Sequence, residues 1–227
     1  MRTPGFFFLL TLFAAPAFAQ PVQPAGSTAT PAIALPAPKT DGTFSLEKAL
    51  HERRSLRGPA ETPLTLEEIG QLCWAAQGVT DEKGHRTAPS AMAAYPLELY
   101  VLAGSVTGLA PGGYHYEPAQ HALTPRTGGP QLVDFEQQAV GQGWTAKVPA
   151  IFVISGSTAK MTRMRDRAAQ FMWVEAGLAA QGFFLEATAL GLGSTYVGGF
   201  DPAAARTALG LAEGEEVLAV LPVGRKP

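Results

Sequence analysis

The sequence has almost none of the residues from which disulfides and thiolate metal sites are built. Cys73 is the only cysteine, so an intramolecular disulfide is impossible and one thiolate cannot build a metal cluster. Cys73 lies between Leu72 and Trp74 in a predicted apolar helix, which indicates a small buried hydrophobic residue. The four histidines show no spacing typical of a metal site, and we predict none.

Charge is also scarce. Asp, Glu, Lys and Arg make up 16% of the chain, its formal net charge is −2, and it contains no basic block. This composition does not favour a nucleic-acid partner. Beyond the N-terminal region no apolar run is long enough for a bilayer, so we expect no stable membrane span in the mature protein.

The N-terminus carries a short apolar run between a basic residue and a cleavage motif. Arg2 precedes apolar residues 6–13, and Ala17-Phe18-Ala19 follows as an A-x-A cleavage site, which is typical of a secretory signal peptide. A membrane anchor fits less well, because the run is too short to span a bilayer and Pro16 interrupts its end. We therefore expect cleavage after Ala19 and a periplasmic or secreted mature protein.

Three parts of the chain are predicted. Residues 1–19 are the signal peptide, residues 20–43 a disordered linker, and residues 44–227 one folded domain. The linker is rich in Pro, Ala, Thr and Gly and cannot bury a core. Cleavage leaves 208 of the 227 residues, enough for one domain with a sizeable core or for one subunit of a dimer.

Helix and strand signals alternate along the folded domain. Ser45 is a predicted N-cap, and Thr65 with Glu68 forms a capping box for a helix that Gly78 ends. Further helices are predicted at 131–140, at 162–190 and after the cap Asp201, and strands at 97–103, 148–155 and 215–224, with a hairpin at 112–125. Strands separated by helices indicate a mixed, layered fold. The helix 162–190 is apolar around much of its circumference, which favours a core or a subunit interface.

The stretch "HERRSLRG" (51–58) concentrates three arginines and a serine within residues 53–57, the arginine segment. In an extended segment alternate side chains point the same way, so Arg53, Ser55 and Arg57 can converge on one anion. Guanidinium groups supply charge-assisted hydrogen bonds and the hydroxyl a short donor. The alternative is a solvated helix C-terminus, where arginines suit the helix dipole.

Three other places offer weaker signals. Pro89-Ser90-Ala91, the Pro-Ser loop, opens a run of small residues that lets a backbone approach a planar ligand. Gly198 and Gly199 offer a second close backbone approach, and Arg225 follows a buried strand near the C-terminus. Each has a structural alternative, namely tight loop packing or a solvated terminal charge.

Taken in order, these motifs resemble those of a known family. The segments "RRSLR", "PLTLEEIGQLCWAAQGVT", "RTAPSAMAAYPLELYVL", "GGYHYEP", "EAGLAAQGFFLEATALGLGSTYVGGF" and "EGEEVLAVLPVGRKP" are similar to the FMN-dependent nitroreductase superfamily. Within it the resemblance is closest to the azoline-dehydrogenase-like branch, the oxidases of thiazole and oxazole peptide maturation. It covers roughly residues 46–227.

The resemblance implies a homodimeric α+β fold with two FMN sites at the subunit interface, and a mixed sheet flanked by helices. The helix 162–190 matches the central dimer helix. The cofactor-binding positions that match are Arg53, Ser55 and Arg225 for the phosphate, Arg54 for an adjacent contact, Arg57 for the pyrimidine edge of the flavin, Pro89, Ser90 and Ala91 for the loop along the isoalloxazine, and Gly198 and Gly199 for the turn facing flavin N5.

The sequence departs from this pattern in three respects. Met92 stands where relatives often have glycine, Gly198 stands where many have glutamate, and a signal peptide precedes the domain. Many relatives are cytoplasmic and use NAD(P)H, which is scarce outside the inner membrane, so the electron donor stays open.

We therefore expect an exported FMN-dependent oxidoreductase that passes hydride through flavin N5 to or from a small organic substrate. No side chain is predicted as a catalytic acid or base, because Tyr95 and Tyr114 are better explained as packing residues. The competing hypothesis is a non-catalytic flavin-binding or ligand-binding protein that kept the fold.

Overall fold

The computed structural model describes residues 31–227, so the predicted signal peptide and the first part of the linker lie outside the described residues. Seven strands form one sheet in the order β1-β6-β5-β3-β7-β9-β8, with every neighbouring pair antiparallel. Their bounds are Ile33–Ala34 (β1), Leu97–Ala103 (β3), Gly112–Glu117 (β5), Ala122–Pro125 (β6), Ala150–Ser157 (β7), Leu192–Ser194 (β8) and Glu215–Arg225 (β9). A separate parallel pair joins β2 (Leu64–Thr65) to β4 (Val106–Thr107).

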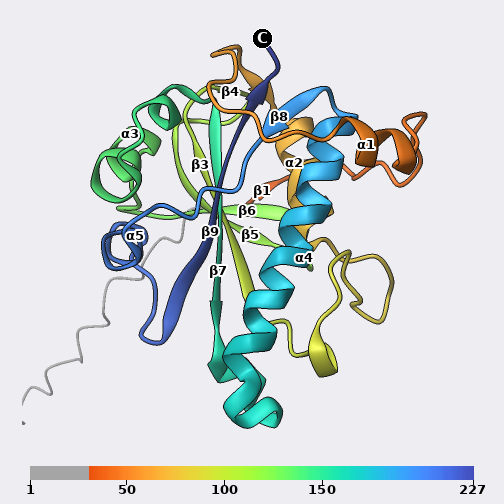
Figure 1. The fold of residues 1–227 in the computed structure, drawn as a ribbon, viewed down its shortest axis with the longest axis vertical. Coiled ribbons are helices and arrows are strands. Elements are labelled where there is room, and N and C mark those ends of the chain that lie inside the picture. The colour runs from red at the N-terminus through yellow and green to blue at the C-terminus, as the bar shows by residue number, and fades with distance from the viewer. Residues whose placement is uncertain (1–30) are drawn as a thin grey trace, which may run out of the picture.

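Helices cover both faces of the sheet (Figure 1). Helices α2 (Leu66–Gln77) and α4 (Ala168–Ala189) share one hydrophobic core, and α3 (Leu132–Phe135) and α5 (Pro202–Leu209) share the other. Strand β3 contributes alternate residues to the two cores, with Leu99 and Val101 in the first and Tyr100 and Leu102 in the second. This three-layer α+β arrangement confirms the predicted fold class.

Local capping signals set several helix ends where the sequence predicts them. Thr65 Oγ1 accepts the N–H of Glu68 at 3.2 Å, and Glu68 Oε2 accepts the N–H of Thr65 at 2.8 Å, which completes the capping box of α2. Asp201 likewise accepts two backbone N–H groups at the start of α5, with Pro202 in the first helical position. These contacts confirm the predicted starts of both helices.

The long helix begins later than predicted. Residues Thr158–Arg167 form short 3₁₀ turns, and α4 proper starts at Ala168. Arg165 has φ 51°, a left-handed conformation that a continuous α-helix cannot contain. The prediction of one helix over 162–190 is therefore wrong for its first turns. No helix within residues 31–227 combines the length and the hydropathy needed to cross a bilayer.

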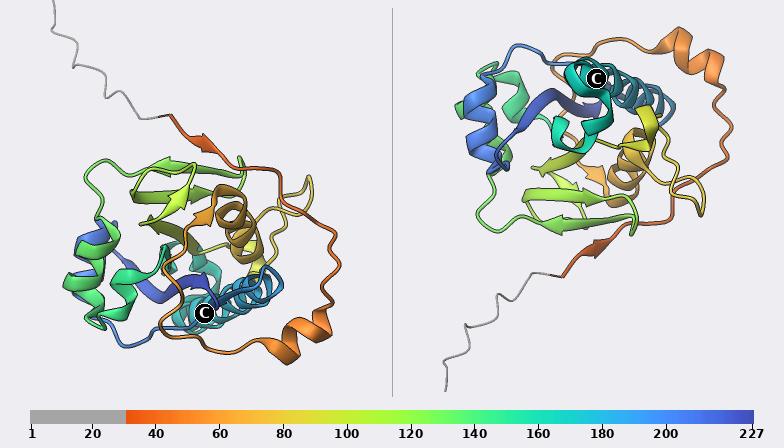
Figure 2. Two further views of the ribbon diagram at one scale, coloured as in Figure 1. Left: turned by 90° about the horizontal axis from the view of Figure 1, so that it is seen from above. Right: turned by 90° about the horizontal axis from the view of Figure 1, so that it is seen from below.

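The N-terminal strap, residues 31–44, differs from the flexible linker expected there. Ile33 and Ala34 pair with Leu123 and Ala122 as an edge strand, and Leu35 is buried. Farther along, the backbone N–H and C=O of Lys39 both bond to the Gln71 side chain, at 2.9 and 3.0 Å. Figure 2 shows the strap passing round the outside of α2 on its way to α1 (Leu46–Glu52). Long-range pairing, which composition does not reveal, orders this part of the linker.

Candidate functional site

The arginine segment leaves α1 as an extended chain that joins the edge of the main sheet. The helix ends where Arg53 adopts φ −56° and ψ 121°, and Arg53 N–H donates to the Ala49 carbonyl at 2.9 Å. Ser55 then pairs with Ser194 of β8 in a parallel bridge, and Leu56 N–H donates to the Ser194 carbonyl at 3.0 Å. The segment is therefore extended where Ser55 pairs with β8, and the chain bends at Arg57 and Gly58.

Gly193 permits this close approach. A Cβ built on Gly193 would lie 2.2 Å from Leu56 Cδ2 and 2.8 Å from Leu56 Cβ, distances that no side chain can occupy. The segment continues until Ala60 N–H donates to the Arg225 carbonyl at 2.9 Å. Residues from near both ends of the folded domain thus meet at one sheet edge, where the structure brings the arginine segment together with Arg225.

The charges at this edge are not equivalent. Within residues 31–227 Arg53 and Arg57 form no ion pair, and Arg57 is exposed. The Arg54 guanidinium instead donates to the carbonyls of His51 and Arg53, at 2.8 and 2.7 Å, and so closes the end of α1.

Arg225 makes a bidentate ion pair. Its Nη1 lies 2.9 Å from Glu68 Oε1 and its Nη2 lies 3.1 Å from Glu68 Oε2. Glu68 is therefore shared between the capping box of α2 and the C-terminal arginine. An anion at this edge would meet Arg53 and Arg57 as free cations, and Arg225 as a cation that a carboxylate already holds in place.

The Gly198-Gly199 turn follows directly from the edge strand. Val197 N–H donates to the Val220 carbonyl, which anchors the turn to β9, and both glycines are exposed. A Cβ at Gly198 would meet nothing nearer than the Tyr196 ring, at 3.6 Å. The turn thus presents accessible backbone just beyond the strand with which the arginine segment pairs, and the Tyr196 hydroxyl, bonded to the Leu218 carbonyl, fixes the neighbouring ring.

The Pro-Ser loop lies elsewhere. Ala91 N–H donates to Glu175 Oε1 at 2.8 Å, and Ser90 Oγ accepts the Tyr95 N–H at 2.8 Å. Glu175 belongs to the first half of α4, whereas the arginine segment pairs with β8 just beyond the end of α4 at Ala189. At about 1.5 Å per helical residue the two places are roughly 20 Å apart along α4. One chain therefore does not bring the Pro-Ser loop to the arginine segment.

Backbone strain is concentrated directly after this loop. Met92, Ala93 and Tyr95 have φ values of 56°, 53° and 46°, in the left-handed region that costs ordinary residues about 1–2 kcal/mol each. Glycine takes this conformation at no steric cost, whereas Met92 adopts it with a side chain that is 67% exposed. The Arg86 guanidinium lies 4.6 Å from the Tyr95 ring centroid and helps to hold the distorted turn.

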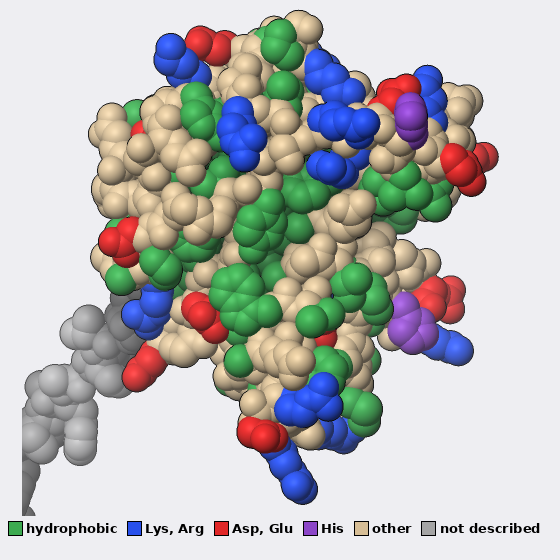
Figure 3. Space-filling model, viewed as in Figure 1, with side chains coloured by type: hydrophobic (Ala, Val, Ile, Leu, Met, Phe, Trp, Pro, Cys, Tyr) green, Lys and Arg blue, Asp and Glu red, His purple; other side chains and the backbone are tan. Residues whose placement is uncertain are grey.

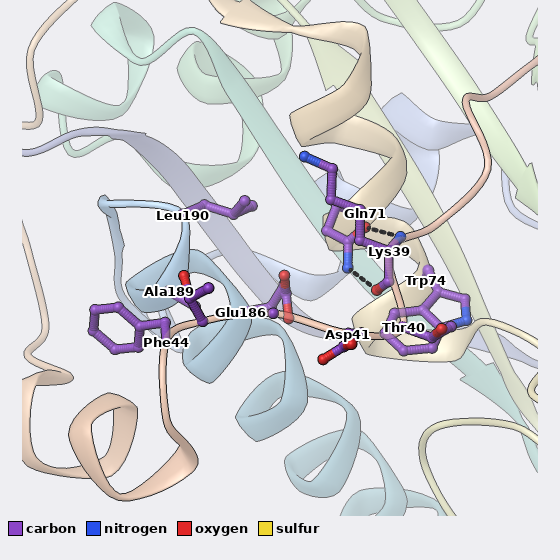
Figure 4. Close-up of a pocket in the computed structure, with 11 residues that line it drawn as sticks. Lys39, Thr40, Asp41, Phe44, Gln71, Trp74, Glu186, Ala189 and Leu190 are labelled. Carbon is purple, nitrogen blue, oxygen red and sulfur yellow. Dashed lines mark hydrogen bonds between the residues drawn. The ribbon is translucent and has the colours of Figure 1, made fainter.

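A cavity of about 400 Å³ lies between the strap and the helix layer, bounded by α2 and the end of α4. Figure 4 shows Phe44 and Trp74 at its two ends with Glu186 between them, and the Gln71 bonds to Lys39 beside it. Burial raises the pKa of Glu186. None of the predicted cofactor residues lines this cavity, so the cation cluster at the sheet edge is the better candidate for an anionic ligand.

One face of α4 is apolar and uncovered. Trp173, Val174 and Leu178 are 46%, 54% and 44% exposed, whereas Met172, Ala176 and Phe183 on the other side are buried. Figure 3 shows hydrophobic side chains across the middle of this face, with Lys and Arg side chains gathered above them over α1 and the C-terminal strand. Exposed apolar surface of this kind marks interaction sites.

Two residues that organise these places were not predicted from the sequence. Glu175 is buried and serves the Pro-Ser loop, and Glu68 serves Arg225 as well as its helix cap. The sequence does single out Glu175, because it is the only acidic residue in the apolar stretch 168–185. Buried carboxylates are retained only where they are paired or bonded. For Glu68 the sequence indicates the capping box but not the pairing with Arg225.

The fold and this site define a class of protein. It is a three-layer α+β protein with a cluster of arginine side chains at one sheet edge and an exposed apolar helix face beside it. A family model described as "Nitroreductase family" matches residues 50–225. A protein of Methanocaldococcus jannaschii with a provisional nitroreductase name is 38% identical over 184 residues, which cover 81% of this chain and 92% of that protein. The chain belongs to the nitroreductase family, a family of oxidoreductases.

Solved structures agree. A provisionally named nitroreductase from Ralstonia eutropha has a TM-score of 0.75 and 27% identity, covering 90% of this chain and 93% of its own. A chain of the E. coli microcin synthetase McbBCD complex has a TM-score of 0.69 and 22% identity, covering 85% and 76%. The NADPH:FMN oxidoreductase from Vibrio harveyi, solved with NAD+, has a TM-score of 0.58 and 18% identity, covering 80% and 68%. The last two likenesses concern the fold alone.

Proposed function

We propose that this protein is an exported, FMN-dependent oxidoreductase that acts on a small organic substrate. The observation that carries the proposal is the meeting of Arg53, Ser55 and Arg57 with Arg225 at the edge formed by β8 and β9. Family membership and the fold shared with an NADPH:FMN oxidoreductase support FMN as the ligand. The apolar run and cleavage motif of residues 1–19 support export.

The residues at the sheet edge fit the phosphate end of FMN. Two guanidinium groups without partners in residues 31–227 and one serine hydroxyl supply charge-assisted and neutral donors to a dianion. Arg225 would contribute through its position, because its pair with Glu68 holds it at the edge before any ligand arrives. Bound FMN would supply the hydride-transfer chemistry, and the exposed backbone of Gly198 and Gly199 would help to hold its ring.

The ring end of the site requires a second subunit. The Pro-Ser loop and the arginine segment lie roughly 20 Å apart along α4 at about 1.5 Å per residue, so one chain cannot present both to a single ligand. A two-fold axis through the uncovered face of α4 exchanges the two ends of the helix. We propose that the partner subunit supplies the Pro-Ser loop to the ring end of the site. Trp173, Val174 and Leu178 supply the apolar contact for this homodimer, and a Cβ at Gly177 on the same face would meet nothing within 4 Å.

The azoline-dehydrogenase-like branch is our choice within the family. Support comes from the order of motifs in the sequence and from the fold shared with the microcin synthetase chain. The electron donor follows from export, because NAD(P)H is a cytoplasmic reductant. We therefore propose a donor other than NAD(P)H.

Two arginine variants test the cofactor site. Arg53→Ala removes a charge-assisted contact of about 1.5–3 kcal/mol to the phosphate, so FMN affinity should fall roughly tenfold or more. Riboflavin has no phosphate, and its weaker binding should hardly change. Arg57→Ala should instead lower the midpoint potential of the flavin, because a cation beside the pyrimidine edge favours the reduced anion.

The measurements are fluorescence titrations of each variant with FMN and with riboflavin, followed by a redox titration. Equal losses for FMN and riboflavin in Arg53→Ala would exclude the phosphate role. An unmoved potential in Arg57→Ala would leave that arginine as a solvated charge. A flavin that binds but is neither reduced nor reoxidised by any donor and acceptor would favour the second candidate, a non-catalytic flavin-binding protein.

A further inference from the structure

A second, smaller cavity lies beside the Pro-Ser loop. It has a volume of about 110 Å³ and is lined by Met92 and Ala94 on one wall and by Lys160, Thr162, Arg163 and Met164 on the other. A water molecule takes about 30 Å³ in the liquid, so the cavity has room for a group of a few heavy atoms. The second wall belongs to the basic segment, Thr158–Arg167, which precedes α4.

The walls of this cavity are strained. Five non-glycine residues within residues 31–227 have positive φ, and four of them lie in or next to these walls: Met92, Ala93, Tyr95 and Arg165. Each left-handed residue costs about 1–2 kcal/mol, which surrounding contacts must offset. Such strain clusters where a protein holds a ligand or a substrate. The three largest cavities differ in this respect, because no non-glycine residue with positive φ lines them.

The cavity is also positively charged. No Asp or Glu lines it, and the basic segment carries four basic residues against one acidic residue. Glu98 accepts a hydrogen bond from Lys160 and so neutralises part of that charge from outside the lining. Arg163 is exposed and forms no ion pair within the described residues. Figure 3 shows the corresponding Lys and Arg side chains at the lower end of the molecule, where Figure 1 places the start of α4.

We propose that the cavity between Met92 and Arg163 is a subsite for an anionic group of the substrate, a carboxylate, sulfonate or phosphate. The proposal rests on the proposed function, because it takes the Pro-Ser loop as the wall of the reaction site. Arg163 would bind the anion through charge-assisted hydrogen bonds, and Thr162 would offer a neutral donor. Met92, which lines the cavity and is 67% exposed, would exclude bulky substrates from it.

Matched acceptors test this charge preference. We would use the FMN-loaded protein and five nitro compounds: neutral nitrobenzene, cationic 4-nitrobenzylamine, and anionic 4-nitrobenzoate, 4-nitrobenzenesulfonate and 4-nitrophenyl phosphate. Calorimetry gives the equilibrium affinity of each compound. After reduction by dithionite under anaerobic conditions, stopped-flow absorbance gives the rate of flavin reoxidation. Each nitro group takes up two electrons and two protons and becomes a nitroso group and water.

Arg163→Ala should weaken at least one class of anion about tenfold or more and leave nitrobenzene unchanged. The class that weakens most identifies the natural anionic group. Arg163→Lys should restore part of the affinity, because it keeps the charge and loses the bidentate geometry. Lys147→Ala is the control, since it removes one exposed positive charge from the far layer of the sheet and should change no affinity.

Three other outcomes are decisive. If reduced wild-type protein is reoxidised equally well by neutral, cationic and anionic compounds, and Arg163→Ala changes nothing, the subsite is wrong while the flavoenzyme stands. If Lys147→Ala weakens the anions as much as Arg163→Ala does, the effect is general electrostatics and the subsite is again wrong. If the protein binds no FMN but binds 4-nitrobenzoate through Arg163, the anion subsite stands and the proposed flavin function is wrong.

Discussion

A histidine held between two carboxylates gives the protein a predictable dependence of stability on pH. Nε2 of His115 lies 2.9 Å from Glu98 Oε2, and Nδ1 lies 2.8 Å from Glu117 Oε1. Glu98 also accepts a hydrogen bond from Lys160, and the Tyr100 ring lies beside the imidazole, tilted by 45° with ring centroids 5.1 Å apart. With both ring nitrogens bonded to carboxylates, the imidazole is held in its protonated form.

The pKa shifts of this cluster have opposite signs. Burial alone would raise the pKa of Glu98, but hydrogen bonds from His115 and Lys160 outweigh it and hold that pKa at about 2, against an ordinary value of 4.5. Burial alone would lower the pKa of His115, yet hydrogen bonds from Glu98 and Glu117 raise it above its ordinary 6.5.

Glu98 therefore stabilises the fold above pH 4.5, and this contribution is lost as the pH falls toward 2. The protonated His115 stabilises the fold below pH 6.5, and its contribution is lost as the pH rises through the raised pKa. The cluster should contribute most between pH 4.5 and 6.5. Since one unit of pKa is worth 1.36 kcal/mol, the shift of Glu98 corresponds to about 3 kcal/mol, counted once because both partners share it.

The test is urea unfolding of wild type and Glu98→Gln at a series of pH values, followed by circular dichroism. The difference in free energy of unfolding should approach about 3 kcal/mol near pH 5.5 and shrink toward zero near pH 2. His85→Gln is the control: a hydrogen bond from His85 lowers the pKa of Asp81, but this pair is exposed to solvent, so its loss should change the profile far less than Glu98→Gln does. A difference between wild type and Glu98→Gln that does not vary with pH would refute the electrostatic account.

Three further predictions follow from single features. Gly193→Ala should cost about 1–3 kcal/mol of stability and weaken FMN binding, because the new Cβ would meet Leu56 at 2.2 Å and push the arginine segment off β8; unchanged unfolding and FMN titrations would show that the edge adapts freely. Leu178→Glu should convert the proposed dimer into a monomer in light scattering, since it buries a charge in the α4 contact; a dimer that persists would place the interface elsewhere. Expression in a Gram-negative host should yield a periplasmic protein whose first residue is Gln20, and an intact Met1 in the cytoplasm would contradict export.

The parts of the fold that the sequence predicted are those fixed by interactions within a few residues. The capping box of Thr65 and Glu68, the Asp201 cap and the strand 97–103 need no knowledge of the rest of the chain. The buried position of Cys73 followed equally directly from its apolar neighbours.

The parts that differed depend on contacts between distant residues. The strap was expected to be flexible because its composition is poor in core residues, yet β6 and Gln71 order it from far along the sequence. The first turns of the helix 162–190 were expected to be helical because nothing local forbids a helix there. The left-handed Arg165 interrupts the helix there, while other residues of the basic segment face Met92 and Ala94 across a cavity.

The candidate site divides in the same way. The alternation of Arg53, Ser55 and Arg57 is a local property, and the structure shows the chain extended at Ser55 beside β8 but bent at Arg57. The contacts that hold the other predicted site residues in place join residues far apart in the sequence. Glu68 and Arg225 are 157 residues apart, and Ala91 and Glu175 are 84 residues apart. The sequence could point to individual residues such as Arg225 and Ala91. It could not show which of two subunits would supply each residue to one bound ligand.

Met92 has a backbone conformation that its own side chain does not favour. Glu175 binds the N–H of Ala91 on one side and Ser90 binds the N–H of Tyr95 on the other, and between them Met92 and Ala93 are left-handed. Glycine would fit at no steric cost, whereas methionine costs about 1–2 kcal/mol there. Burial offsets little of that cost, because the side chain is 67% exposed. This cost is consistent with the proposed role of Met92 at the anion subsite, whose cavity it lines.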